Sequence, residues 1–394
     1  MKPLRFGVLG LSRGWSYGRL ILGYAGCSVA AVCDLNPAYQ ERHRATYPDI
    51  LLCGSFEELL AADIDAVVIA GYCTEHAPQA VQALRAGKHV LSEVTAFHTV
   101  AEGVALARAV EETGLTYMMA ANTCFSAGLE HMIGVARSGR LGEFMYAECE
   151  YIHNMPAPFN RRPDGSMHWR FWQPCIHYCT HSLSPVLKMC NDRPVSVVGM
   201  NTGDKITREW GWPTGRADMG IGLVKMARGG VVRVMVTFAN SRVGGHFFQY
   251  YGTKGCMEND RISQNALYVL EKDNALTEGW VGYAPRRERL EQEIKASGAG
   301  HGGADHLVLH EFVKAIREGT PPPVDIYEAA DATLPGILAH RSAVEGGRPF
   351  VVPDLRDESV RKEYENDDWS PLPDALALAN RGARDSSVPR GATP

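Results

Sequence analysis

Residues 4–14 read LRFGVLGLSRG, a short apolar run that enters a turn containing glycine. A helix is expected to follow over 15–23, and a second apolar strand, 28–33, ends at Asp34. Glycines in such a turn let the backbone approach a pyrophosphate at a helix N-terminus, where unpaired N–H groups and the helix dipole favour negative charge. An acid about twenty residues further on accepts ribose hydroxyls and repels a 2′-phosphate. The stretch therefore predicts a dinucleotide site that prefers NAD to NADP.

The turn itself departs from the usual GxGxxG pattern. Gly10 is in place, but Ser12 stands at the second glycine position, and the third glycine is displaced to Gly14 or replaced by Trp15. Alone, these letters also fit a plain strand-to-helix turn, and Asp34 also fits a helix N-cap. The interpretation therefore depends on the elements that follow.

Helices and strands alternate through the rest of the N-terminal third. Helices are expected at 55–62, 75–86 and 101–113, and strands at 66–70, 89–91 and 117–120. This alternation predicts an α/β domain with a doubly wound parallel sheet, a Rossmann fold, over residues 1–125.

From about Gly128 the pattern changes to a helix ending near residue 138 and then to longer strand-like runs. Those runs are 144–153, 195–201, 220–225, 231–238 and 247–251, and two late helices follow at 306–318 and 327–345. We expect an α+β domain with an open, mostly antiparallel sheet over residues 126–355. Residues 356–394, rich in charge, Pro and Ser, are expected to form an extended arm or tail.

Composition narrows the classes of function. The 394 residues are 45% hydrophobic and 22% charged, ample for a buried core. A net charge of -5 with interspersed signs is not typical of proteins that bind nucleic acid or an anionic membrane, so neither partner is expected. No secretory signal or membrane-length apolar run is visible. Ten scattered cysteines fit reduced thiols, and the cytoplasm is the expected compartment.

The segment 87–96, GKHVLSEVTA, ends a predicted strand at Glu93. With SGRLGE at 138–143, GTKG at 252–255 and the late helix pair, it resembles the Gfo/Idh/MocA oxidoreductases over about residues 4–355. Within that superfamily the chain is similar to the NAD-dependent glycosidases of glycoside hydrolase family 109, typified by α-N-acetylgalactosaminidases. The matching pieces are Glu93-Val94, Asn122, YIH at 151–153, Trp169-Arg170, YCTH at 178–181 and GHGGAD at 300–305.

The resemblance implies NAD as cofactor, a small carbohydrate as substrate and a homo-oligomer. For the cofactor it implies a pyrophosphate and adenosine end at Gly10, Ser12, Arg13 and Asp34, a nicotinamide half at Cys73, Thr74, His76, Glu93 and Val94, and the nicotinamide ribose at Asn122. The sugar would face Tyr151, Arg170, Tyr178 and His181, with Tyr178 and His181 as the proton-transfer groups. The chain departs from the family pattern at Thr95 and Cys179, which replace prolines, and at Gly244 and Gly245, where a tyrosine is expected.

The chemistry follows from what replaces the usual base. Dehydrogenases of the superfamily carry a lysine directly after the glutamate and an aspartate four residues before a histidine, whereas this chain has Val94 and His177 there. The resemblance instead implies a glycosidase that transiently oxidises C3 of the sugar, removes the C2 proton, expels the C1 substituent, adds water and returns the hydride. Tyr178 and His181, three apart, are predicted to share one face at a helix start and to serve as the acid/base pair.

Other interpretations of these residues stay open. A sugar or cyclitol dehydrogenase with a rearranged base is the alternative enzyme, and a non-catalytic sugar or dinucleotide sensor is the third possibility. Tyr178 and His181 also fit a buried structural pair, and Tyr151 also fits an ordinary sheet aromatic.

Three further groups of side chains allow other roles. Cys175, His177, Cys179 and His181 alternate as zinc ligands can, but such spacing strains tetrahedral geometry, and no metal is expected. His301 and Asp305 fit either an active-site loop or a solvent turn. In FNRRPDGSMHWRFW at 159–172, Arg161 and Arg162 are more typical of a surface loop than Arg170 is, and the arginine-aromatic pattern suits an anionic sugar such as a sulfoquinovoside.

Overall fold

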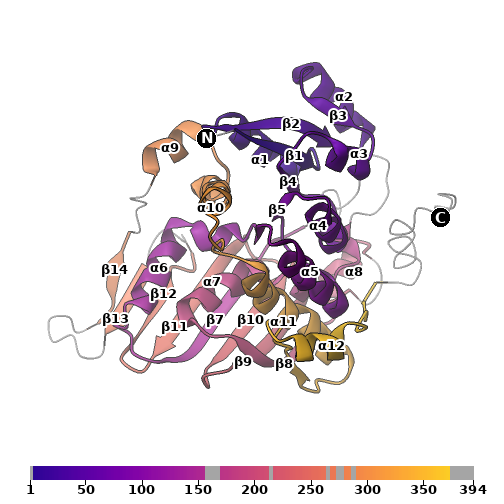
Figure 1. Cartoon of the computed structure of the whole chain (residues 1–394). Coiled ribbons are helices and arrows are strands. Elements are labelled where there is room, and N and C mark those ends of the chain that lie inside the picture. The colour runs from indigo at the N-terminus through magenta and orange to yellow at the C-terminus, as the bar shows by residue number, and fades with distance from the viewer. Residues whose placement is uncertain are drawn as a thin grey trace.

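The computed structural model describes residues 3–155, 169–212, 216–262, 267–271, 279–284 and 290–372 (Figure 1). Its N-terminal part is a doubly wound parallel sheet, as predicted, and its strands lie in the order β3-β2-β1-β4-β5-β6. The strands are β1 (Leu4–Leu9), β2 (Cys27–Cys33), β3 (Leu51–Cys53), β4 (Ala66–Ile69), β5 (His89–Ser92) and β6 (Tyr117–Met119). Its helices are α1 (Arg13–Leu22), α2 (Pro37–Thr46), α3 (Phe56–Ala61), α4 (His76–Arg85) and α5 (Val100–Thr113).

The strand order reverses between β1 and β4, and the turns after these two strands therefore lie side by side. In doubly wound sheets, ligands bind at the carboxyl ends of the strands at this reversal. All four residues of β4 are buried, as expected for a strand covered by helices on both faces. Helix α5, which packs on α4, is bounded by local signals: a capping box of Thr99 and Glu102 starts it, and Gly114 in the left-handed region ends it.

The second part is built on a mixed sheet whose described strands run β14-β13-β12-β11-β7-β10-β9-β8-β15. Only the β7–β10 pair is parallel among these strands, so the prediction of an open, mostly antiparallel sheet is confirmed. The strands are β7 (Phe144–Ile152), β8 (Pro194–Asn201), β9 (Met219–Met226), β10 (Val231–Thr237), β11 (Gly245–Gly252), β12 (Gly255–Asn259), β13 (Leu267–Glu271), β14 (Val281–Tyr283) and β15 (Phe350–Val351).

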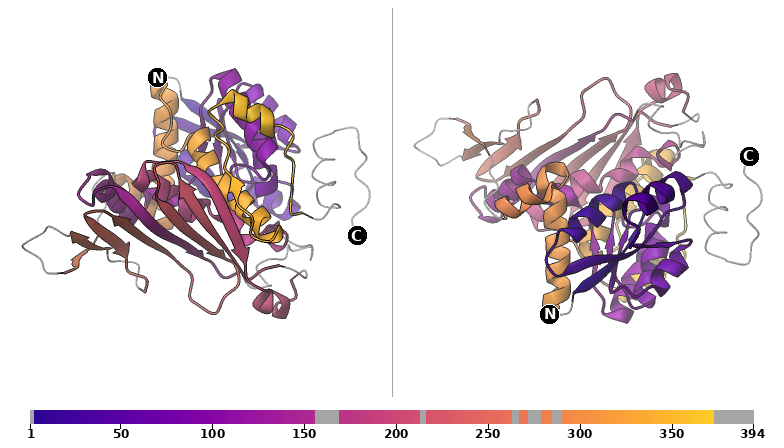
Figure 2. Two further views of the ribbon diagram at one scale, coloured as in Figure 1. Left: turned by 90° about the horizontal axis from the view of Figure 1, so that it is seen from below. Right: turned by 90° about the horizontal axis from the view of Figure 1, so that it is seen from above.

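Helices cover one face of this sheet, and the other face is turned outward (Figure 2). The helices of this part are α6 (Ala127–Arg137), α7 (Thr180–Cys190), α8 (Lys205–Glu209), α9 (Glu291–Ser297), α10 (Ala304–Glu318), α11 (Ile326–Val344) and α12 (Glu358–Tyr364). Alternating burial along β9 fits a sheet with a single covered face. Helix α12 corrects the expectation of an extended arm from residue 356, because Arg361 is buried and pairs with Glu111 of α5.

Candidate active site

The cofactor turn fits a dinucleotide because its backbone comes close to the neighbouring strand end. Gly10 has φ +95°, and a Cβ there would lie 2.5 Å from the carbonyl oxygen of Ala70, so only glycine is accommodated. Ser12 precedes α1 without a capping hydrogen bond from its side chain, which leaves the N-terminal N–H groups of this ten-residue helix available to an anion. The residues present therefore fit a bound pyrophosphate.

Asp34 follows β2 and organises the same turn. Its carboxylate accepts hydrogen bonds from the backbone N–H of Leu11 at 2.5 Å and of Asn36 at 2.7 Å. Asn36, not Asp34, caps α2. The acid thus lies beside the glycine turn, where the prediction of an adenosine-ribose partner requires it.

Arg13, the first residue of α1, points away from the expected adenosine end. Its Nε donates to Glu93 at 2.8 Å, and its two terminal nitrogens donate to the two oxygens of Asp305 at 2.7 and 2.8 Å. The guanidinium also lies 4.8 Å from the ring centre of Tyr17. Arg13 therefore connects the glycine turn with Glu93 and with the start of α10.

Glu93 follows β5 and is 8% exposed. Burial raises the pKa of its carboxyl, while the positive charge of Arg13 opposes that rise. Val94, in the position of the dehydrogenase lysine, is buried, and the Val94–Thr95 peptide bond is cis. At this point the chain offers a carboxyl and an alkyl group, and no amine.

The remaining predicted cofactor residues border the same region. Cys73 and Thr74 lie in a short 3-10 turn after β4, and the Sγ of Cys73 donates to Oε1 of Gln173 in the second part of the chain. His76 begins α4 and contacts the carbonyl oxygen of Thr95 at 2.9 Å through Nδ1, and burial lowers its pKa to about 4. Asn122 is buried and donates to Asp305 at 3.1 Å.

The predicted sugar face is assembled from β7 and from the start of α7. Tyr178 ends a 3-10 turn, and His181 lies in the first turn of α7, with their ring centres 5.2 Å apart. Tyr151 of β7 stacks on His181 at 5.2 Å and lies 5.6 Å from Tyr178. Arg170 lies 4.3 Å from the ring of Trp169 and 5.7 Å from that of Tyr178. The structure thus brings all four predicted residues together.

Burial sets the protonation of this face. It raises the pKa of Tyr178 to about 12, and the charge of Glu93 acts in the same direction while that of Arg170 opposes it. Burial also lowers the pKa of His181 well below its ordinary value, and His246, His301 and Arg13 lower it further. At neutral pH the tyrosine therefore keeps its proton and the imidazole is uncharged. These are the states needed for a hydrogen-bond donor beside a proton acceptor.

The structure adds residues that the sequence did not place. His246 of β11 lies 5.0 Å from Tyr151 and 6.5 Å from His181, and His153 stacks on Tyr151 with ring centres 5.7 Å apart. The sequence pattern of β11 did not indicate that His246 lies beside Tyr151. These two residues are neighbours because of the register in which β11 pairs with β7. His301 contacts Asp305 at 2.9 Å, so the GHGGAD motif belongs to the site.

The alternating cysteines and histidines do not converge. His177 faces His98 and His340, with ring centres 5.5 and 5.6 Å away, whereas His181 faces Tyr151. In the described ranges, no three His, Cys, Asp or Glu side chains are arranged to hold a metal ion. Arg161 and Arg162 lie outside the described residues.

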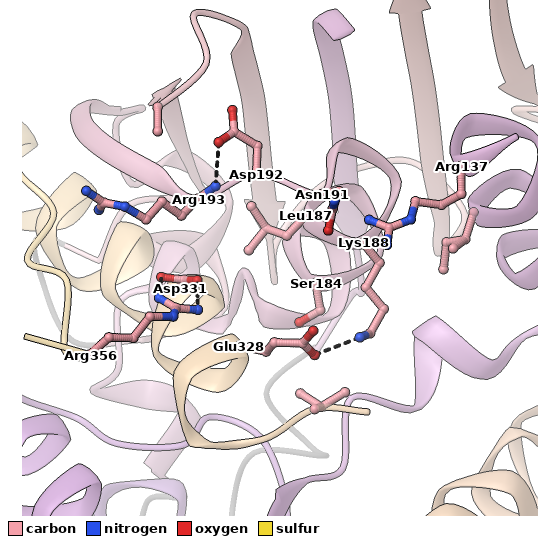
Figure 3. A pocket seen from close by; sticks show the side chains of 13 residues that line it. Arg137, Ser184, Leu187, Lys188, Asn191, Asp192, Arg193, Glu328, Asp331 and Arg356 are labelled. Atoms are coloured by element: carbon pink, nitrogen blue, oxygen red, sulfur yellow. Dashed lines mark hydrogen bonds and ion pairs between the residues drawn. The ribbon is translucent and has the colours of Figure 1, made fainter. Parts of the chain in front are cut away.

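A hollow of about 590 Å³ lies at the opposite end of α7 from His181 (Figure 3). Two ion pairs join charged groups of its lining: Lys188 with Glu328 at 2.6 Å and Arg356 with Asp331 at 2.8 Å. None of the predicted site residues lines it. The hollow is therefore separate from the candidate active site.

Each of the two parts of the chain matches a known protein family. Residues 4–121 match the oxidoreductase family with an NAD-binding Rossmann fold, and residues 212–361 match the C-terminal domain of glycosyl hydrolase 109. A glycosyl hydrolase family 109 protein of Saccharopolyspora erythraea is 27% identical, covering 90% of this chain and 83% of the relative. An alpha-N-acetylgalactosaminidase of Tannerella forsythia is also 27% identical, covering 89% of this chain and 86% of the relative.

Solved structures show the same fold at lower identity. A levoglucosan dehydrogenase in complex with NADH and L-sorbose superposes with a TM-score of 0.75 at 19% identity, covering 90% of this chain and all of that one. An oxidoreductase domain protein from Kribbella flavida gives a TM-score of 0.77 at 18% identity, with the same coverage. The N-terminal part is therefore similar to the NAD-binding domain of the Gfo/Idh/MocA oxidoreductases, and the C-terminal part to the C-terminal domain of glycosyl hydrolase 109, which supports an NAD-dependent enzyme.

Proposed function

We propose that the chain is an NAD-dependent glycoside hydrolase that acts on a small carbohydrate by transient oxidation at C3, elimination across C1 and C2, addition of water and re-reduction. The observation that carries this proposal is the pairing of a protonated Tyr178 with a neutral His181 beside Glu93, at a site where Val94 replaces the amine base of the dehydrogenases. The relatives named as family 109 glycosidases support it.

The roles follow from protonation. NAD, when bound, supplies an acceptor for the C3 hydride and returns it later. His181 is the proton acceptor, because its imidazole is neutral at pH 7 and its buried Nδ1 has no partner in the described structure. It takes the C3 hydroxyl proton as the hydride leaves, releases that proton to water, and then takes the C2 proton in the elimination. Tyr178 keeps its hydroxyl proton and donates to the oxygen at C3, where negative charge develops as the C2 proton leaves.

His301 is proposed as the acid/base group at the glycosidic oxygen. It is the more accessible imidazole of this site, with 58% of its side chain exposed, whereas His181 is 8% exposed. Its charge influences His181, His153 and His246, so it lies near the same sugar face. A leaving alcohol must be protonated and must diffuse away, and an accessible imidazole at the edge of the site suits that step.

The proposal is tested with 4-nitrophenyl and methyl α- and β-glycosides, N-acetylgalactosaminides included, in D2O. We expect cleavage with deuterium at C2 of the released sugar, no net NADH, and bound NAD in the native mass spectrum of the purified protein. Stoichiometric NADH with an oxidised sugar would replace the proposal by a dehydrogenase. Bound NAD without turnover of any glycoside would indicate a sensor.

We further propose that the preferred sugar carries an anionic group, such as the sulfonate of a sulfoquinovoside. The support is Arg170, whose guanidinium lies over Trp169 and beside Tyr178 on the sugar face. Within the same set of glycosides, anionic members should then give the higher kcat/KM. Equal kcat/KM for neutral and anionic aryl glycosides would contradict this choice of substrate.

We also propose that the enzyme works in the cytoplasm. All ten cysteines are unpaired, and nine of them are buried, which fits a reducing compartment. In the part of the chain that the structure describes, none of the helices has both the length and the apolar character needed to cross a bilayer.

A homo-oligomer formed through the outer face of the large sheet is proposed as the working assembly. Sheet register aligns Met200 with Ile221 and Met235, and Leu223 with Arg233, on neighbouring strands. Met200 is 69% exposed and Leu223 is 50% exposed, an unusual exposure for apolar side chains in the middle of a sheet. Light scattering should give a multiple of 43.2 kDa, and the double variant Met200→Lys, Leu223→Lys should give the monomer. A wild-type monomer would contradict the proposal.

A further inference from the structure

Asp305, in the first turn of α10, is the most heavily bonded carboxylate near the candidate site. It is fully buried and accepts hydrogen bonds from Arg13 at 2.7 and 2.8 Å, from Asn122 at 3.1 Å and from Nδ1 of His301 at 2.9 Å. Burial alone would raise the pKa of this carboxyl, but the hydrogen bonds from Arg13 and His301 hold it well below its ordinary value. Asp305 is therefore ionised at neutral pH.

The glycine-rich loop before α10 is shaped around this carboxylate. His301, Gly302 and Gly303 have φ of +52°, +61° and +89°, a run of left-handed backbone that only glycine adopts freely. A Cβ on Gly300 would lie 3.0 Å from Oδ2 of Asp305, closer than ordinary contacts allow. His301 is a non-glycine residue in this left-handed region, a conformation that persists where the surrounding contacts hold it.

The direction of these hydrogen bonds fixes the chemistry of His301. An ionised carboxylate only accepts, so Nδ1 of His301 must carry a hydrogen, and Nε2 is left to take or give a proton. Arg13 is bound by the same carboxylate and also by Glu93. A buried ion pair is weak evidence for stability alone, because removing two charges from water costs about what their attraction returns. The buried ion pair of Arg13 with Asp305 is better explained by its effect on the positions of the side chains that it joins.

We propose that Asp305 is a positioning residue, which fixes the tautomer and orientation of His301. Through Arg13, which binds both Asp305 and Glu93, it also fixes the position of that imidazole relative to Glu93. This inference rests on the proposed function, in which His301 protonates the leaving alcohol. It adds that His301 can transfer a proton to the leaving alcohol only when the carboxylate of Asp305 holds its imidazole in the correct tautomer.

The test compares Asp305→Asn with His301→Gln and with the control Asp331→Asn. Asp331 is also buried and also paired with an arginine, at 2.8 Å from Arg356, but lies in the hollow at the far end of α7. Arginine only donates, so in Asp305→Asn the oxygen of the new amide would turn to Arg13 and Asn122, and its NH2 group would face His301. His301 would then accept at Nδ1 and hold its proton on the wrong nitrogen.

We expect Asp305→Asn and His301→Gln to lower kcat/KM for methyl glycosides about 10²–10⁴-fold, the range typical of a lost general acid. For 4-nitrophenyl glycosides, whose leaving group needs no proton, the loss should stay below about tenfold. The double variant should be no slower than the worse single variant, since both act on one proton transfer. Asp331→Asn should leave the ratio between the two leaving groups unchanged.

The outcomes separate this inference from the proposed function. If methyl and nitrophenyl glycosides lose activity in parallel in Asp305→Asn, or if the two substitutions are additive, Asp305 is structural and the inference is overturned. If the wild type releases no C2-deuterated sugar, the proposed function fails first. In that case 15N NMR of His301, assigned by difference with His301→Gln, still decides: the Nδ1–H form must change to the Nε2–H form in Asp305→Asn, and an unchanged tautomer rejects the role.

Discussion

Replacing Tyr178 with phenylalanine is expected to lower kcat for glycoside cleavage about 10²–10³-fold, the usual cost of removing one donor to a developing oxyanion. The substitution deletes a single oxygen and leaves the ring against Tyr151, His181 and Trp169. Because burial raises the pKa of this hydroxyl to about 12, it is present as a donor throughout the working pH range. The loss should therefore fall on kcat and be constant between about pH 6 and 9.

The measurement is a steady-state assay with native mass spectrometry of each variant. NAD occupancy should be equal in the wild type and in Tyr178→Phe, since Tyr178 lies on the proposed sugar face. Tyr24→Phe is the matched control, because its hydroxyl also makes a hydrogen bond, at 2.9 Å to His310, between the turn after α1 and α10. A Tyr178→Phe enzyme with more than about a third of wild-type kcat would remove the tyrosine from the chemistry.

Acid is expected to destabilise the fold steeply once the pH falls below about 6.5. Eight histidines have pKa values lowered by burial, and the lowering is large for five of them. These five are His76, His246 and His340, each lowered to about 4, and His177 and His181, both lowered well below the ordinary value. In the unfolded chain each imidazole binds a proton as the pH passes about 6.5, whereas the folded chain stays unprotonated until about pH 4. Folding stability is therefore complete above about pH 6.5 and lost between about 6.5 and 4.

The size of this effect follows from the proton count. Each such histidine removes at most about 1.4 kcal/mol per pH unit, so five remove up to about 7 kcal/mol per unit, against a total stability of about 5–15 kcal/mol. The carboxyls of Glu93, Glu328 and Asp331, whose pKa values are raised chiefly by burial, act with the opposite sign and offset part of the loss. We expect Tm to fall by more than about 10 °C between pH 7 and pH 5.

Thermal unfolding at constant ionic strength checks this expectation. His177→Asn supplies the internal control, because both ring nitrogens of His177 are buried without a partner in the described structure, and asparagine does not titrate. Its stability should depend less steeply on pH, by about 1.4 kcal/mol per unit. Equal Tm at pH 7 and pH 5 would show that these imidazoles are charged or solvated in the folded protein.

The sequence predicted what local patterns control. The parallel sheet followed from alternating apolar runs, and the juxtaposition of Tyr178 and His181 followed from their spacing of three at a helix start. Helix α2 and strand β3 were missed because their patterns are weak: only His43 is buried in α2, and β3 has three residues. Strands β12 to β14 and helix α12 were also missed.

The contacts of Arg13 lay beyond sequence reasoning. Its partner Asp305 is 292 residues away, so no periodicity or spacing relates them. The resemblance placed Arg13 with the adenosine end of the cofactor, whereas the structure holds its guanidinium between Glu93 and Asp305. Of the six residues 298–303, GAGHGG, four are glycines, which indicated a special backbone but not which carboxylate it encloses.

Residues from the C-terminal part of the chain complete the packing of the N-terminal sheet. Phe312 of α10 is fully buried and packs edge-on against Phe6 of β1, and the N–H of Met119 in β6 donates to the carbonyl oxygen of Val324 at 3.0 Å. During synthesis the first 125 or so residues thus leave the ribosome with part of their apolar surface bare and one strand edge unpaired. The nucleotide-binding half cannot complete its packing until some two hundred later residues have emerged, so its folding is coupled to that of the C-terminal part of the chain.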